Sequence, residues 1–164
     1  KQVGSSNIKY KIPKNIEEKL FLIDSGKPKE TTGEMVEMVG ALRAMPVQSF
    51  KIILNKIEIE TKKILDAIEK ENVDLFKKCL TSNEKLLEDL GVVSDKTKKL
   101  LISLSKFGVG KVTGAGGRET GSGYILFFAE NKKELESFMR NNKINYYKFI
   151  TDNQGLKRIS TLIN

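Results

Sequence analysis

Apolar and polar residues recur along this chain with two different periods, and the change of period separates a helical part from a strand-rich part. The compact apolar run KLFLID, from Lys19 to Asp24, predicts a first strand. The polar loop SGKPKETTG follows it and ends near Thr31 or Thr32, and either residue is suited to cap the next helix. Apolar residues then recur at spacings of three and four, which predicts four helices. The first helix follows the polar loop and ends at Ala44. The other three run from Pro46 to about Glu71, from Val73 to Leu90 with Gly91 as the stop, and from Ser94 or Asp95 to Gly108.

After Gly108 the pattern changes to that of short strands. The predicted elements are strands from Val109 to Thr113 and from Tyr124 to Ala129, a helix from Lys132 to Asn141, and a last strand pair, Tyr146 to Ile150 and Leu156 to Ile159, turning at DNQG. Helices followed by a β-β-α-β-β segment predict an α+β fold, with a small, mostly antiparallel sheet covered by helices.

A glycine-rich loop, within KVTGAGGRETGSGYILFF, lies between two of the predicted strands. Its glycines permit positive φ angles and close approach of another group to the backbone. Exposed N–H groups in such a turn can bind an anion, and this would suit a phosphoryl-transfer site. The spacing is neither that of a Walker A motif nor that of a Rossmann fingerprint. A plain β-hairpin with a long loop explains the pattern equally well.

Composition narrows the classes of function. The 164 residues suffice for one domain, or for one domain and part of another. The net charge of +8 favours anionic partners, although the basic runs lie among acidic residues at helical spacing, as on solvated helix faces. The chain has no histidine and a single cysteine, Cys79, which excludes histidine-based catalysis, His-ligated metal sites and an internal disulfide. A cytoplasmic protein without a membrane span is expected.

Three stretches together resemble a known family. The run KVTGAGGRETGSG resembles the third conserved motif of the GHMP kinases, which include galactokinase, homoserine kinase, mevalonate kinase and phosphomevalonate kinase. LIDSGKPKETTGEMV, from Leu22 to Val36, is similar to a strand, loop and helix of mevalonate kinases. SNEKLLEDLGVVSDKTKKLL, from Ser82 to Leu101, is similar to the helix, LGV turn and next helix that precede the glycine motif in that family. The order matches as well, and the resemblance extends from Leu22 to about Ala129.

The resemblance implies a site for ATP-dependent phosphoryl transfer to a small-molecule hydroxyl, with mevalonate as the expected acceptor and Mg²⁺ as the expected metal. It implies that Gly114, Ala115, Gly116 and Gly117 form the loop that approaches the transferred phosphate and the substrate. It places the Thr32 hydroxyl near the phosphoryl acceptor, although Thr32 could equally be a helix cap. It also makes Lys27 a candidate for a charged contact at the same site. Arg118 either pairs with a phosphate or is an exposed charge.

The chain departs from the family in two ways. Arg118, Glu119 and Thr120 replace the usual glycine-rich continuation of the loop. The family's phosphate-binding loop, its N-terminal lysine and its catalytic aspartate do not occur in this sequence, so no catalytic residue and no metal ligand are assigned to it. The resemblance therefore implies the C-terminal part of a kinase that is inactive without its N-terminal half. Residues 1–44 would complete the N-terminal domain, and 45–164 would form the ferredoxin-like C-terminal domain.

Other hypotheses stay open at this point. The acceptor could be that of phosphomevalonate kinase or of another GHMP kinase. A basic RNA-binding module is a second class, because GSGYILFF faintly resembles an aromatic RNA-binding strand, but burial of both strand faces explains the same alternation better. A non-enzymatic interaction domain is a third class, and a homodimer is compatible with each of them. For the kinase hypothesis, Gly116→Val is expected to lower turnover with little loss of fold stability.

Overall fold

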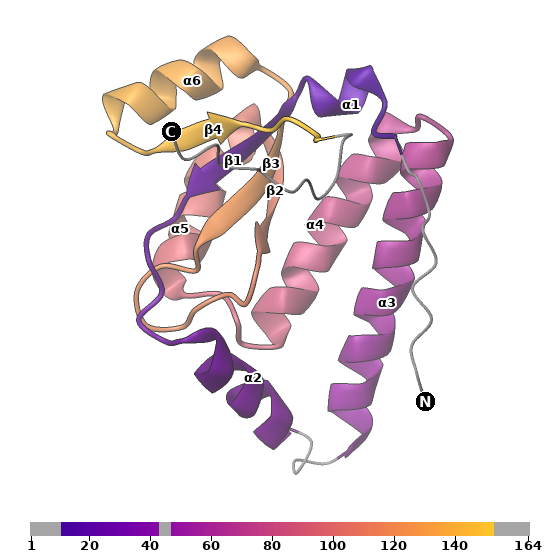
Figure 1. Ribbon diagram of the computed structural model, residues 1–164, viewed down its shortest axis with the longest axis vertical. Coiled ribbons are helices and arrows are strands. Elements are labelled where there is room, and N and C mark those ends of the chain that lie inside the picture. Colours follow the sequence, from indigo (N-terminus) through magenta and orange to yellow (C-terminus); the bar gives the residue numbers. More distant parts are fainter. Residues whose placement is uncertain (1–10, 43–46, 153–164) are drawn as a thin grey trace, which may run out of the picture.

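The computed structural model describes residues 11–42 and 47–152. The elements in chain order are α1 (Lys14–Glu17), β1 (Leu20–Asp24), α2 (Thr32–Ala41), α3 (Val47–Glu69), α4 (Val73–Asp89), α5 (Asp95–Leu104), a 3₁₀ turn (Ser105–Phe107), β2 (Gly108–Thr113), β3 (Tyr124–Ala129), α6 (Lys132–Asn141) and β4 (Tyr146–Lys148). The strands form one antiparallel sheet in the order β2-β3-β1-β4, with helices packed around it (Figure 1). The predicted α+β class, a small antiparallel sheet covered by helices, is confirmed.

The first strand lies inside this sheet. Leu22 of β1 is opposite Leu126 of β3 on one side and opposite Tyr147 of β4 on the other. The described sheet therefore contains strands from both sides of the domain boundary predicted at residues 44 and 45. An N-terminal domain that includes the rest of residues 1–44 stays a prediction.

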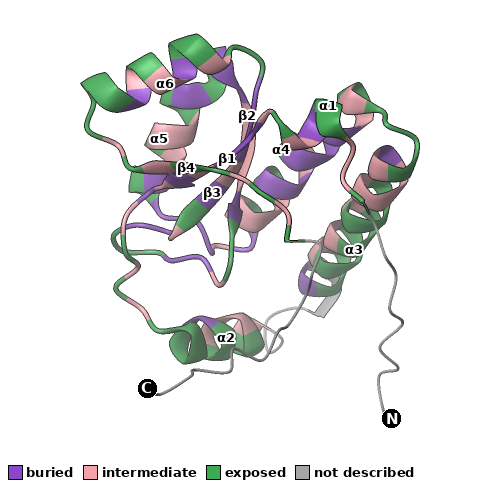
Figure 2. Ribbon diagram, turned by 45° about the horizontal axis from the view of Figure 1, so that its top comes forward, coloured by how far each residue is buried: buried purple, intermediate pink, exposed green. Residues whose placement is uncertain are grey.

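Both faces of the sheet are covered along most of β3, from Ile125 to Ala129, while Tyr124 at its start is exposed. Ile125 and Phe127 belong to a core cluster with residues of α5 and α6, while Leu126 and Phe128 pack with residues of α1, α3 and α4. Figure 2 shows this burial along the strands and along α4. Because Phe127 and Phe128 are each 1% exposed, they cannot stack on RNA bases, and the core interpretation of the aromatic strand is confirmed.

Local sequence sets the helix ends. The Thr31 side chain accepts the N–H of Glu34, whose carboxylate accepts the N–H of Thr31, so Thr31 rather than Thr32 caps α2. Gly91 follows α4 with φ +79°, as a helix-ending glycine requires. Helix α5 ends at Leu104, before the predicted Gly108, because a 3₁₀ turn intervenes before β2. The short α1 was not predicted, since four residues carry too little periodicity to be recognised.

The remaining predicted elements agree with the structure to within a few residues at their ends. The exception is the predicted strand Leu156 to Ile159, which lies outside the described residues. Strand β4 pairs with β1, and the predicted pairing of the last two strands stays a prediction. Within 11–42 and 47–152, no helix is both long and apolar enough to cross a lipid bilayer.

Candidate functional site

The glycine loop that joins β2 to β3 packs backbone against backbone on two other segments. Gly123 donates its N–H to the carbonyl of Gly26 at 3.1 Å, and Gly117 donates to the carbonyl of Val92 at 3.0 Å. The first contact brings the loop to the β1–α2 connection, and the second brings it to the α4–α5 connection. Three segments from different parts of the sequence therefore meet here.

Most glycines in the loop serve this close packing. A Cβ on Gly116 would lie 2.2 Å from the carbonyl oxygen of Val92, and one on Gly121 would lie 2.0 Å from that of Gly26. A Cβ on Gly117 would lie 2.3 Å from the Gly121 oxygen. No real Cβ approaches backbone so closely, so these three glycines are required by the fold itself.

Gly114 differs from Gly116, Gly117 and Gly121. It has φ +88°, and a Cβ placed on it would meet no atom within 4 Å. Gly114 is exposed and Ala115 is half-buried, whereas Gly116 and Gly117 are buried and the Gly117 N–H is already bonded. Of the four predicted loop residues, Gly114 and Ala115 are thus the ones that a ligand can approach in this conformation.

Four buried hydroxyl groups fix the base of the loop, and sequence reasoning missed them. The Ser25 hydroxyl donates to the Gly123 carbonyl at 2.8 Å, and Ser122 donates to the Gly117 carbonyl at 3.0 Å. Ser94, the N-cap of α5, donates to the Thr120 carbonyl at 2.7 Å. Thr97 connects them, since its hydroxyl lies 3.1 Å from that of Ser25 and 2.9 Å from that of Ser94. Single Ser and Thr residues so far apart in sequence carry no pattern that would reveal the network.

Replacing Thr97 by valine, which has the same shape, is expected to lower the free energy of unfolding by about 1–2 kcal/mol, because it removes the hydroxyl at the centre of this buried network. Urea denaturation followed by circular dichroism measures the change. Thr81→Val is the matched control, because Thr81 is an exposed helical threonine whose hydroxyl bonds the carbonyl of Lys77. Equal losses in the two variants would show that the network adds no stability.

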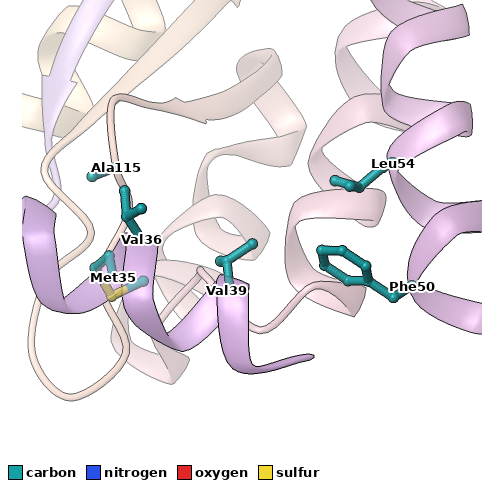
Figure 3. Close-up of a pocket in the computed structure, with 7 residues that line it drawn as sticks. Met35, Val36, Val39, Phe50, Leu54 and Ala115 are labelled. Atoms are coloured by element: carbon teal, nitrogen blue, oxygen red, sulfur yellow. The ribbon is translucent and has the colours of Figure 1, made fainter. Parts of the chain in front are cut away.

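An apolar pocket of about 380 Å³ opens beside the exposed part of the loop. Figure 3 shows Met35, Val36 and Val39 of α2 facing Phe50 and Leu54 of α3, with the loop residue Ala115 alongside. The only loop residue in its lining is Ala115, the neighbour of Gly114. Backbone that can approach a polar group and an apolar hollow for a carbon skeleton thus lie next to each other.

The other predicted site residues lie around the same loop. Thr32 is the exposed first residue of α2. Lys27 is exposed, and its carbonyl accepts the hydroxyl of Thr120 at 2.9 Å. Arg118 is also exposed, while its backbone N–H bonds the Glu30 carboxylate. The structure brings all three segments together, but roles for these side chains in binding stay predictions.

A buried acid lies beneath the strand that leads into the loop. Glu84 of α4 is 6% exposed, and its carboxylate accepts the N–H of Val112 in β2 at 2.7 Å. Burial raises the pKa of Glu84 to about 7, against the opposing effect of that hydrogen bond. The neighbouring Lys111 is largely enclosed, and burial lowers its pKa. The hydrogen bond to Val112 gives Glu84 a structural role, because it bonds the outer edge of the described sheet.

The donor groups of the described residues bear on metal binding. Within the described ranges, no group of three or more His, Cys, Asp or Glu side chains is arranged to hold a metal ion. The described residues therefore do not fit Mg²⁺ by themselves.

The comparisons with known proteins agree with this geometry. The family model described as GHMP kinases C terminal matches residues 64–148, which is more than half of the chain. The fold and loop thus define the C-terminal domain of a GHMP kinase, and the chain belongs to that family. No curated protein sequence matches the chain significantly.

Solved structures share the fold. A Lin0012 protein from Listeria innocua is 21% identical with a TM-score of 0.70, over 81% of this chain and 39% of that one. The L. major mevalonate kinase in complex with R-mevalonate is 16% identical with a TM-score of 0.66, over 81% and 43%. The Methanococcus jannaschii mevalonate kinase is 23% identical with a TM-score of 0.61, over 89% and 44%. The chain spans less than half of each of these proteins, and identities this low show likeness of fold alone.

Proposed function

We propose that this chain is the C-terminal domain of an ATP-dependent kinase that phosphorylates a hydroxyl group of a small molecule, with mevalonate as the first candidate acceptor. The observation that carries the proposal is the position of Gly114. Unlike Gly116, Gly117 and Gly121, this glycine has open space where a Cβ would lie, and its neighbour Ala115 lines an apolar pocket.

In this proposal the chain supplies electrostatic stabilisation and substrate contacts. Backbone N–H groups at Gly114 and Ala115 would face the phosphoryl group, and fixed dipoles aimed at developing charge lower the barrier to transfer. The pocket lined by Met35 and Phe50 would hold the carbon skeleton of the acceptor. Thr32, Lys27 and Arg118 would act at the edge of this surface.

An N-terminal half would supply the remaining groups. In the proposed whole enzyme, ATP would supply the phosphoryl group, and Mg²⁺ held by that half would neutralise charge on the phosphates. The general base, the metal ligands and most of the nucleotide site are assigned to that half, so the 164-residue chain alone should not turn over substrate. Mevalonate is favoured by the resemblance of the segment LIDSGKPKETTGEMV to mevalonate kinases, whose solved structures also share the fold. A cytoplasmic location is part of the same proposal.

The direct test is ADP release from ATP and Mg²⁺ by the protein expressed from its natural reading frame, extended upstream of Lys1. Mevalonate, 5-phosphomevalonate, homoserine and galactose are offered separately. Release with mevalonate alone supports the full proposal, and release with a different acceptor corrects the substrate. If no acceptor supports release by the extended protein, the proposed activity fails and only the family fold remains.

Gly114→Ala is expected to lower kcat/KM of the extended enzyme by about 100-fold, because a methyl group would stand where the phosphoryl group approaches the backbone. Steady-state kinetics measure the change. The matched control is Gly123→Ala, since Gly123 has a similar φ of +78° and equally open space around a Cβ. Both substitutions introduce similar backbone strain, so equal losses of activity would mean that Gly114 is not part of the site.

A further inference from the structure

A carboxylate of the chain itself occupies the turn that follows Gly117. One oxygen of Glu30, Oε1, accepts the N–H of Arg118 and the N–H of Glu119, each at 3.0 Å. Two successive backbone N–H groups that converge on one anionic oxygen form an anion-binding nest. Glu30 thus fills the part of the loop in which three polar residues replace the family's glycines.

The contacts on either side of Glu30 hold the same two segments together. The Lys29 ammonium pairs with the Glu119 carboxylate, and the Thr120 hydroxyl donates to the Lys27 carbonyl at 2.9 Å. The Lys29–Glu119 pair is exposed, and exposed pairs contribute little free energy. Charge-assisted hydrogen bonds to two backbone donors are stronger, so Glu30 is the contact that sets the shape of the turn.

The charge of Glu30 agrees with this assignment. The pKa of its carboxyl is held below the usual value, first by its own backbone N–H and also by those of Arg118 and Glu119, against the effect of burial. Its second oxygen, Oε2, is shielded from solvent and has no hydrogen-bond partner among the described residues. The ionised carboxylate is therefore enclosed in the turn and held there through Oε1.

We propose that the turn at Arg118 and Glu119 is an oxyanion site with a built-in occupant, and that Glu30 is the residue that positions the second half of the glycine loop. While Glu30 is in place, inorganic phosphate does not enter the turn. Only one consequence rests on the proposed kinase function: a substrate phosphoryl group is then directed to Gly114 and Ala115. The oxyanion site itself does not depend on any catalytic activity.

The test uses the 164-residue chain and amide hydrogen exchange measured by NMR. In Glu30→Ala, the exchange of the Arg118 and Glu119 amides is expected to rise by about tenfold or more, because each loses a charge-assisted acceptor. Glu30→Gln keeps an acceptor oxygen and should lie between Glu30→Ala and the native chain. Glu37→Ala, which removes an exposed carboxylate of α2, should leave both amides unchanged.

Added anions then distinguish a site from a mere structural contact. Formate or inorganic phosphate, titrated at constant ionic strength, should restore protection of the two amides in Glu30→Ala and shift their resonances, whereas neutral formamide should not. The native chain should show no such shift. Loss of protection without rescue by either anion, or equal shifts in the native chain, would overturn the proposal. Because no phosphoryl transfer is measured, these outcomes are independent of whether the extended protein is a kinase.

Discussion

Gly116→Ala is expected to lower the free energy of unfolding by about 4 kcal/mol, a large part of the stability of a domain of this size. Gly116 has φ +76°, a conformation that costs alanine about 1 kcal/mol. The larger part comes from the contact of the new Cβ, which would lie 2.2 Å from the carbonyl oxygen of Val92. That carbonyl is also bonded to the N–H of Gly117, so it cannot move away without breaking the loop.

Urea denaturation of Gly116→Ala and Gly114→Ala, compared under the same conditions, separates the two contributions. Gly114 has a similar φ of +88° but open space around its Cβ, so its alanine variant should lose only about 1 kcal/mol. A difference of less than about 1 kcal/mol between the variants would mean that the Val92 contact relaxes easily. The sequence-based expectation that Gly116 could be replaced with little loss of stability took no account of this contact.

Glu84→Gln is expected to abolish a pH dependence of stability that reaches about 3 kcal/mol in the native chain. Burial raises the pKa of Glu84 to about 7 in the folded chain, from its ordinary value of 4.5. The folded state therefore holds the proton more tightly. Its contribution to stability is complete below pH 4.5 and is lost as the pH rises through about 7. Glu88 raises this pKa further, while Lys111 and Lys98 lower it.

Unfolding free energies of the native chain and of Glu84→Gln, measured from pH 4 to pH 8, test this expectation. Their difference should change by about 3 kcal/mol across the range, with the native chain losing stability relative to the variant as the pH rises. The exposed Glu69 at the end of α3 provides the control, since Glu69→Gln removes one carboxylate without touching the sheet. Parallel pH profiles for the native chain and Glu84→Gln would mean that water or local opening solvates the buried acid.

The class of fold could be predicted from the sequence because its cause is local and repeated. The apolar period of α3 and α4, the stop at Gly91 and the strands on either side of the glycine loop are each encoded within a few neighbouring residues. The α6 bounds, Lys132 to Asn141, agree with the prediction. For the same reason α1 was missed, since a single turn offers no period.

The order of strands could not be predicted in this way. Strand β1 lies between β3 and β4 in the sheet. Both partners come about a hundred residues or more after β1 in the chain, and nothing in KLFLID specifies them. Pairing of distant strands depends on which apolar faces fit together after the chain has collapsed. The predicted domain boundary at residue 44 was drawn without this information.

The sequence by itself determined that a glycine-rich loop joins two buried strands, and through resemblance it indicated a GHMP kinase. Only the tertiary structure decided what each glycine does. Gly116 and Gly121 are needed because backbone from other segments occupies the space of their side chains. Gly117 is needed because the Gly121 backbone of the same loop and the Pro28 side chain occupy that space, whereas Gly114 has open space. The same holds for Glu30 and Glu84, whose surroundings are set by loops and strands far away in the sequence. The sequence specifies the type of each residue, but its neighbours are set only when distant segments pack together. Its burial, charge state and role follow from those neighbours.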